Sequence, residues 1–177
     1  MLQGWHEFYG LLGTAAAALV ALLFVAASIG AGTLSAERAS PTRTFTSPIV
    51  FHYTFVLFLS LVALVPVNTD RSLAIIIGLS AAAGLAYSSL ILSRVMRTST
   101  VTDIDDHLGY GASPVAGYAA ALAAALFFFN HSSIGPPLLA GALILLLLIN
   151  IRNAWDLTVF FARRRAEGQS SANSNRP

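Results

Sequence analysis

Four polar residues interrupt the last long apolar run of the chain, and their spacing would place them along one stretch of helix. They are Asn150, Arg152, Asn153 and Asp156. Arg152 and Asp156 are four residues apart, so on a helix they share a face and lie close enough to pair. Ionisable side chains are costly within a membrane, and those found there commonly serve a function. This polar strip is therefore the first candidate for a site.

Three interpretations of the strip stay open. In the first, the membrane ends near Ile151 and the strip belongs to a cytoplasmic extension, with Trp155 at the interface. In the second, the polar side chains clamp the last span to neighbouring helices. In the third, they form a solute or ion site.

His52 and Tyr53 are a second polar pair, about one turn into the apolar run that begins at Pro48. A histidine at this position serves either as a hydrogen-bonded structural residue or headgroup contact, or as a ligand or proton carrier. With the orientation derived below, the pair lies in the cytoplasmic half of the membrane, as do the strip and Arg94. Any pocket that these residues share should open to the cytoplasm.

Acidic residues gather between the third and fourth apolar runs, in Thr102-Asp103-Ile104-Asp105-Asp106-His107. Carboxylates and imidazole can ligate a divalent metal, provided that several of them converge in space. The same residues suit the start of a helix, with Thr102 or Asp103 as N-cap and the acids at the positive end of the helix dipole. We favour capping and expect no metal site.

Catalytic motifs are absent from the sequence, which contains no G-x-S-x-G, no H-E-x-x-H, no phosphate loop and no dinucleotide fingerprint. It also contains no cysteine, which excludes disulfides, thiolate metal sites and a thiol nucleophile. We therefore expect neither an enzyme nor a bound cofactor.

The composition indicates that these residues lie in a lipid bilayer. Hydrophobic residues make up 56% of the 177 positions and charged residues only 10%, whereas about a quarter of the residues of a soluble domain are charged. A soluble fold of this size could not bury so much apolar surface. The one cluster of basic residues, 163–165, directly follows an apolar run, which fits membrane anchoring and not nucleic-acid binding. We predict an all-α, polytopic integral membrane helical bundle.

Five apolar runs predict five transmembrane helices in a single bundle, residues 1–162. The expected spans are about 8–33, 48–67, 72–96, 109–129 and 137–162, lengths typical of membrane-crossing helices. Pro48 suits the first turn of its helix, and the tight turn at 68–71 makes spans two and three antiparallel neighbours. The polar residues 163–177 are predicted to form a disordered cytoplasmic tail.

The placement of arginine sets the orientation, because Lys and Arg near span ends favour the cytoplasm. One side receives only Arg71, and Arg152 lies within a span. The other side receives the remaining eight, which are Arg38, Arg43, Arg94, Arg97, Arg163, Arg164, Arg165 and Arg176. This bias predicts the N-terminus outside and the C-terminus in the cytoplasm, an N-out/C-in arrangement.

Small residues recur at four-residue spacing in three of the spans, and such stripes let membrane helices approach closely. They are Gly13-Ala17-Ala21, Gly78-Ala82-Ala86 and Gly117-Ala121-Ala125. The stripes favour a tight bundle, with contacts either within one chain or between copies.

Two segments carry a resemblance to a family, namely Trp5-His6-Glu7-Phe8-Tyr9 with the alanine-rich helix that follows it, and Ile151-Arg152-Asn153-Ala154-Trp155-Asp156. They resemble a group of uncharacterised small bacterial multi-span membrane proteins that end on an Asn-Ala-Trp-Asp signature. That group more often has histidine at the position of Arg152. The resemblance implies a setting in the bacterial inner membrane.

Two functions follow as hypotheses. The first is a non-enzymatic helical bundle that acts as a structural or interaction component, with a second copy or another membrane protein as its partner. The alternative is an oligomeric ion channel or small-solute transporter with a polar site that faces the cytoplasm.

Overall fold

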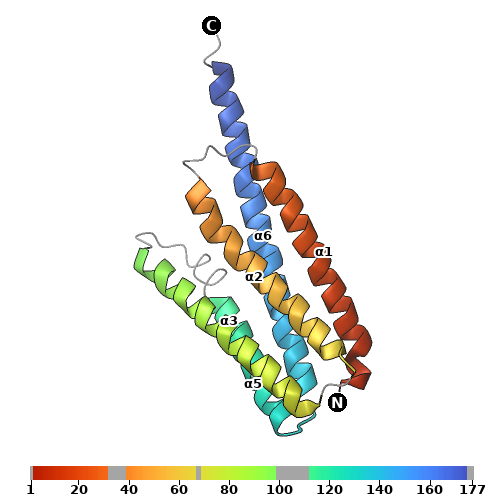
Figure 1. Cartoon of the computed structure of the whole chain (residues 1–177). Helices are drawn as coiled ribbons and strands as arrows, with labels where there is room; N and C mark the ends of the chain where they lie inside the picture. The colour runs from red at the N-terminus through yellow and green to blue at the C-terminus, as the bar shows by residue number, and fades with distance from the viewer. Residues whose placement is uncertain (1, 32–38, 67–68, 99–111, 175–177) are drawn as a thin grey trace.

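In the described part of the chain, five α-helices run up and down as an all-α bundle (Figure 1). This computed structural model describes residues 2–31, 39–66, 69–98 and 112–174, with the backbone alone at 29–31, 39–47, 94–98 and most of 157–174. A short 3-10 turn, η1 (Gln3–Trp5), leads into the first helix. The five helices are α1 (His6–Ala31), α2 (Ala39–Leu64), α3 (Asp70–Thr98), α5 (Ser113–Phe129) and α6 (Gly135–Ser174).

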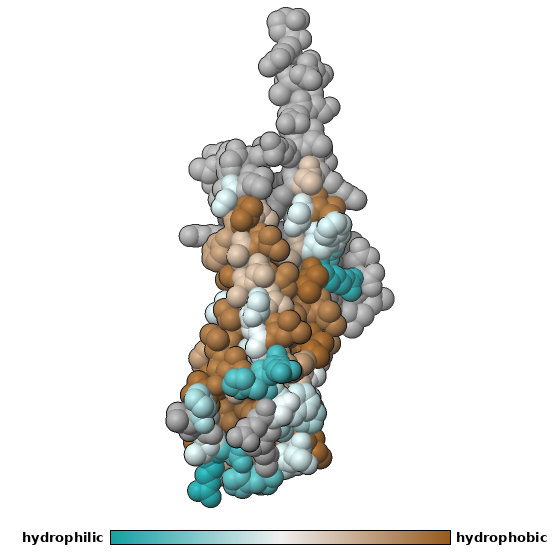
Figure 2. All heavy atoms as spheres, turned by 90° about the vertical axis from the view of Figure 1, so that its right-hand side faces the viewer, coloured by the Kyte–Doolittle hydropathy of each residue, from teal (hydrophilic) through white to brown (hydrophobic). Residues whose placement is uncertain are grey.

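The predicted helical class is confirmed, and three helices are long and apolar enough to cross a membrane. The segments concerned are His6–Ser28, Asp70–Ser93 and Gly135–Asp156. The apolar parts of the other two helices, Pro48–Leu64 and Ser113–Phe129, are shorter. Hydrophobic residues cover most of the middle of the face shown in Figure 2, and large apolar side chains such as Leu11 and Leu79 are exposed. This surface is compatible with a membrane protein.

Contacts between the helices are uneven. α6 packs along α5 and also contacts α2 and α1, while α1 packs along α2 and α3 packs along α5. α2 and α3 follow each other through a short turn, as predicted, but they share few contacts. The main neighbour of α3 is α5, because its small residues face that helix: Gly78 lies opposite Ala125, and Gly84 lies opposite Tyr118.

An apolar core runs through all five helices. Its fully buried side chains include Tyr9, Val56, Leu59, Ile77, Ala124, Phe128, Leu139 and Leu143. α5 contributes mostly alanine to this core, so its neighbours on both sides approach its backbone closely. Of the three small-residue stripes, only 117–125 is buried at all three positions. In the other two stripes Ala17, Ala21, Ala82 and Ala86 are exposed, so only their glycines face another helix of the chain.

Two helix boundaries differ from the sequence-based predictions. α2 begins at Ala39, so that Pro48 lies inside it; the proline removes one backbone hydrogen bond, to the carbonyl of Thr44, and the helix continues. α6 remains helical through Ser174, where the polar composition predicts disorder, and it extends beyond the other helices (Figure 1). Continuing an existing helix avoids the unfavourable nucleation step. The predicted start near 109, and with it the metal and capping alternatives for 102–107, lies outside the described residues.

Candidate functional site

His52 of α2 and Tyr118 of α5 form a buried hydrogen bond. Nδ1 of the imidazole lies 2.6 Å from the phenol oxygen, and the two residues are 3% and 0% exposed. In the tautomer with its proton on Nε2, the Tyr118 hydroxyl donates to Nδ1. The bond ties α2 to the α3–α5 pair, a connection that the α2–α3 turn by itself does not provide.

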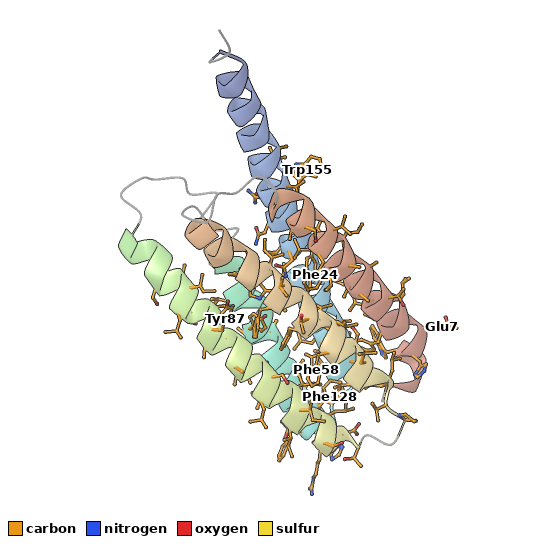
Figure 3. All side chains as sticks on the ribbon, turned by 45° about the horizontal axis from the view of Figure 1, so that its top comes forward. Glu7, Phe24, Phe58, Tyr87, Phe128 and Trp155 are labelled. Carbon is orange, nitrogen blue, oxygen red and sulfur yellow. The ribbon has the colours of Figure 1, made fainter. Side chains whose placement is uncertain are left out.

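Aromatic rings surround this hydrogen bond on three helices. The Phe51 and Tyr87 rings lie 4.6 Å apart between centroids, and the Phe55 and Tyr118 rings lie 4.7 Å apart edge to face. Figure 3 shows Tyr87 on the side of α3 that faces α2. Because apolar surroundings lower the local dielectric, they strengthen the bond and would penalise either partner left alone.

Gly84 of α3 makes room for Tyr118. A β-carbon at position 84 would overlap the tyrosine ring, so only glycine lets the ring lie against the α3 backbone. Sequence analysis singled out His52 but missed Tyr118 and Gly84. The signal that was available is a lone tyrosine in the alanine-rich segment 113–129, which has to bury its hydroxyl next to a partner.

Tyr53 faces a different side of α2 from His52. It packs with Leu23 of α1 and Ile49 of α2, and Leu147 and Ala154 of α6 pack against this group. Successive side chains on a helix point about 100° apart, so two neighbouring residues serve two different helix interfaces. His52 and Tyr53 therefore do not face one shared space.

The polar strip of α6 is also divided. Asn150 and Asn153 are 0% and 2% exposed and continue the buried face of the helix, whereas Arg152 and Asp156 are exposed. Among the described residues the only ion pair is that between Asp70 and His131, so Arg152 and Asp156, whose spacing allows a pair, do not form one there. Trp155 projects away from the bundle (Figure 3) and is 68% exposed.

Of the two polar atoms in the Asn150 side-chain amide, one has a hydrogen-bond partner among the described residues and the other has none. Its Nδ2 donates to the carbonyl of Leu146 at 2.9 Å. Its Oδ1 is buried and has no hydrogen-bond partner among the described residues, and the same holds for the hydroxyl of Tyr53. A buried polar atom without a partner is costly, and among the described residues the hydroxyls of Ser60 and Ser88 share this state.

Two polar contacts link helices and turns at the end of the bundle where the N-terminus lies. The Tyr9 hydroxyl of α1 donates to the carbonyl of Pro136, at the start of α6, over 2.9 Å. At the same end, Asp70 of α3 lies 3.0 Å from Nδ1 of His131, in the turn between α5 and α6. His131 has a positive φ of 53°, which is uncommon for a residue other than glycine.

Hydrogen bonding between neutral side chains is the chemistry that the described interior offers. Within the described ranges, no three histidine, aspartate or glutamate side chains lie close enough together to hold a metal ion. Comparison with known proteins adds no relative, since no family model, curated protein or solved structure matches the chain.

Proposed function

We propose that this chain is a multi-pass protein of the bacterial inner membrane with five spans, and that it acts as a structural or interaction component and not as an enzyme. The lengths of the helices, the distribution of arginine and the pairing of the buried polar groups support this function.

The lengths of the two shorter helices support the count of five. A helix of 17 residues is about 25 Å long at about 1.5 Å per residue, near the lower limit for crossing the hydrocarbon core. Pro48–Leu64 and Ser113–Phe129 lie alongside the three longer segments in the same bundle (Figure 1). A bilayer that covers the long helices would therefore cover these two as well.

The arrangement of the chain ends and turns supports the N-out/C-in orientation. The N-terminus and the α2–α3 and α5–α6 turns lie at one end of the bundle, and the C-terminus at the other (Figure 1). The first of these ends has Arg71 as its only arginine. The other end receives the arginine-rich segments, which the cytoplasmic side favours.

The observation that carries the structural role is the His52–Tyr118 hydrogen bond. The His52 imidazole is 3% exposed and is bound to a tyrosine of another helix, so it links two helices. Polar side chains that bond across membrane helices hold bundles together. The exposed Ala17, Ala21, Ala82 and Ala86 leave α1 and α3 with close-approach surfaces for a second copy or another membrane protein.

Reconstitution tests this role. The purified protein is placed in liposomes, and the flux of potassium, protons and glycerol is followed. The structural role predicts rates equal to those of empty liposomes. A flux that Asn150→Leu abolishes, while Leu148→Ala on the exposed side of α6 leaves it intact, would overturn the proposal.

One observation favours the alternative, an oligomeric channel or small-solute transporter. Asn150 and Asn153 lie on the interior face of α6 in the half of the bundle that the orientation assigns to the cytoplasm. A solute path along this face would use these amides and Tyr53. The same flux measurement decides between the two functions.

A further inference from the structure

We propose that Tyr53 and Asn150 bind a small neutral molecule between α1, α2 and α6. The molecule accepts a hydrogen bond from the Tyr53 hydroxyl and donates one to Oδ1 of Asn150. The site depends only on how these three helices pack, and it would exist in a purely structural bundle as well as in a transporter.

The register of α1 against α2 fixes the position of Tyr53 along the bundle axis. Gly13 lies opposite Ser60, with a distance of 3.2 Å from a β-carbon built on the glycine to Cβ of the serine. The two helices run in opposite directions, so seven residues further along α1 and seven back along α2, Val20 comes opposite Tyr53. Val20 packs against the cluster that contains Tyr53, in agreement with this register.

The packing of α6 against the cluster places Asn150 along the bundle. The hydrogen bond from Tyr9 to Pro136 joins α1 and α6, and further along these helices Val20 and Leu147 pack against the same cluster. Leu147 and Ala154 of α6 both pack against the cluster that contains Tyr53. Asn150 lies between these two residues, about one turn from each on the same helix face, and so above Tyr53 along the bundle.

The directions in which the two side chains lean reduce the separation of their polar ends along the bundle axis. Helical side chains lean towards the N-terminus of their own helix. α2 runs down and α6 runs up in the view of Figure 1, so Tyr53 leans up towards the level of Asn150, and Asn150 leans down towards that of Tyr53. The bond from Nδ2 of Asn150 back to Leu146 has this direction. The two polar ends therefore converge.

The polar atoms at this point lack partners. The Tyr53 hydroxyl and Oδ1 of Asn150 are buried without a hydrogen-bond partner among the described residues, in side chains that are 1% and 0% exposed. A molecule that accepts from one and donates to the other satisfies both atoms. Buried waters satisfy such groups in many proteins.

The surroundings select a neutral ligand. The cluster around Tyr53 consists of apolar side chains, including Leu19, Val20 and Leu23, while Arg152 and Asp156 are exposed and offer it no counter-charge. An ion without a counter-charge would lose far more hydration energy than two neutral partners return. Water and small polar solutes such as urea share the required chemistry.

Solid-state NMR of the whole protein in lipid bilayers tests the site. Transfer of magnetisation from water protons to the side-chain amide of Asn150 is measured, with the signal assigned by its loss in Asn150→Leu. We expect transfer of the same order as that to the exposed Asn130, and a reduction of at least about threefold in Tyr53→Phe. A second sample with isotope-labelled urea separates the two sources, since transfer from urea identifies a solute site and transfer from water alone a water site. No transfer from either, or transfer that Tyr53→Phe leaves unchanged, would overturn the proposal.

A double-mutant cycle gives a second readout that does not depend on NMR assignment. If one molecule bridges Tyr53 and Asn150, the effects of Tyr53→Phe and Asn150→Leu on the unfolding constant should be coupled by about threefold, as for other polar pairs between membrane helices. Ser60→Ala is the matched control, because it also removes a buried hydroxyl without a described partner from α2, but two turns away. Ser60→Ala and Asn150→Leu should have additive effects on the unfolding constant. If Tyr53→Phe and Asn150→Leu are additive in the same way, the two residues do not share a ligand.

Discussion

Gly84 of α3 lies against the ring of Tyr118 of α5, with no space between them for a β-carbon. The same tyrosine bonds to His52 of α2. A glycine on one helix therefore sets the position of a ring on the next, and that ring holds a third helix. This arrangement leads to the first two predictions.

Substitution Gly84→Ala should destabilise the bundle by about 1–3 kcal/mol, the range found when extra carbon atoms are forced into a packed interior. The ring of Tyr118 or the whole of α3 has to move. Thermal unfolding in detergent or bicelles measures the effect. Gly141→Ala is the control, because nothing lies within 4 Å of a β-carbon there, and it should be neutral or slightly stabilising. Equal stability of the two variants would show that α3 and α5 are further apart.

Substitution Tyr118→Phe removes the partner of the His52 imidazole and leaves a polar ring nitrogen buried. We expect a loss of about 1–2 kcal/mol, and a coupling with His52→Phe of about 0.6 kcal/mol, with an upper range of about 1.7 kcal/mol. The free energy of unfolding of both single variants and the double variant gives the coupling. Tyr87→Phe keeps its ring contacts with Phe51 and should have a smaller effect. Strictly additive effects of the first two substitutions would mean that the hydrogen bond contributes nothing.

Substitutions on the buried face of the α6 polar strip should lower stability much more than those on its exposed face. Asn150→Asp places a carboxylate at a fully buried position and should lower stability by several kcal/mol, about 3 or more. Arg152→Gln and Asp156→Asn alter exposed side chains and should stay within about 0.5 kcal/mol. Unfolding in bicelles separates these cases. A large effect at Arg152 with none at Asn150 would reverse the assignment of the buried face.

The backbone at His131 favours residues that tolerate a positive φ. His131→Asn should be accepted, because asparagine visits the left-handed region readily. His131→Val should lose about 1–2 kcal/mol, mostly from the backbone, since an exposed pair such as Asp70–His131 contributes at most about 1 kcal/mol. Asp70→Asn in the same stability assay measures the share of the pair. A loss in Asp70→Asn as large as that in His131→Val would assign the effect to the pair.

Sequence reasoning reached the helical class and the helices themselves because apolar runs of this length have few alternatives. It identified His52, Tyr53, Asn150 and Asn153 as residues of interest, and all four are buried. It placed them in the same half of the membrane because depth along the membrane can be read from a sequence. The direction of a side chain around its helix depends instead on which helices pack together. Tyr118 and Gly84 were missed for the same reason, because no local sequence pattern shows that α3 packs on α5.

Labelling of single cysteines in intact cells tests the central claim, five spans with the N-terminus outside, most directly. The chain contains no cysteine, so each variant carries one reactive thiol. Ser133→Cys in the α5–α6 turn and Thr69→Cys before α3 lie at exposed positions at one end of the bundle, and Ala112→Cys before α5 is exposed at the start of that helix. A membrane-impermeant maleimide should label Ser133→Cys and Thr69→Cys in intact cells. It should label Ala112→Cys only after cell lysis. Labelling of Ala112→Cys in intact cells, or protection of Ser133→Cys, would contradict the proposed topology.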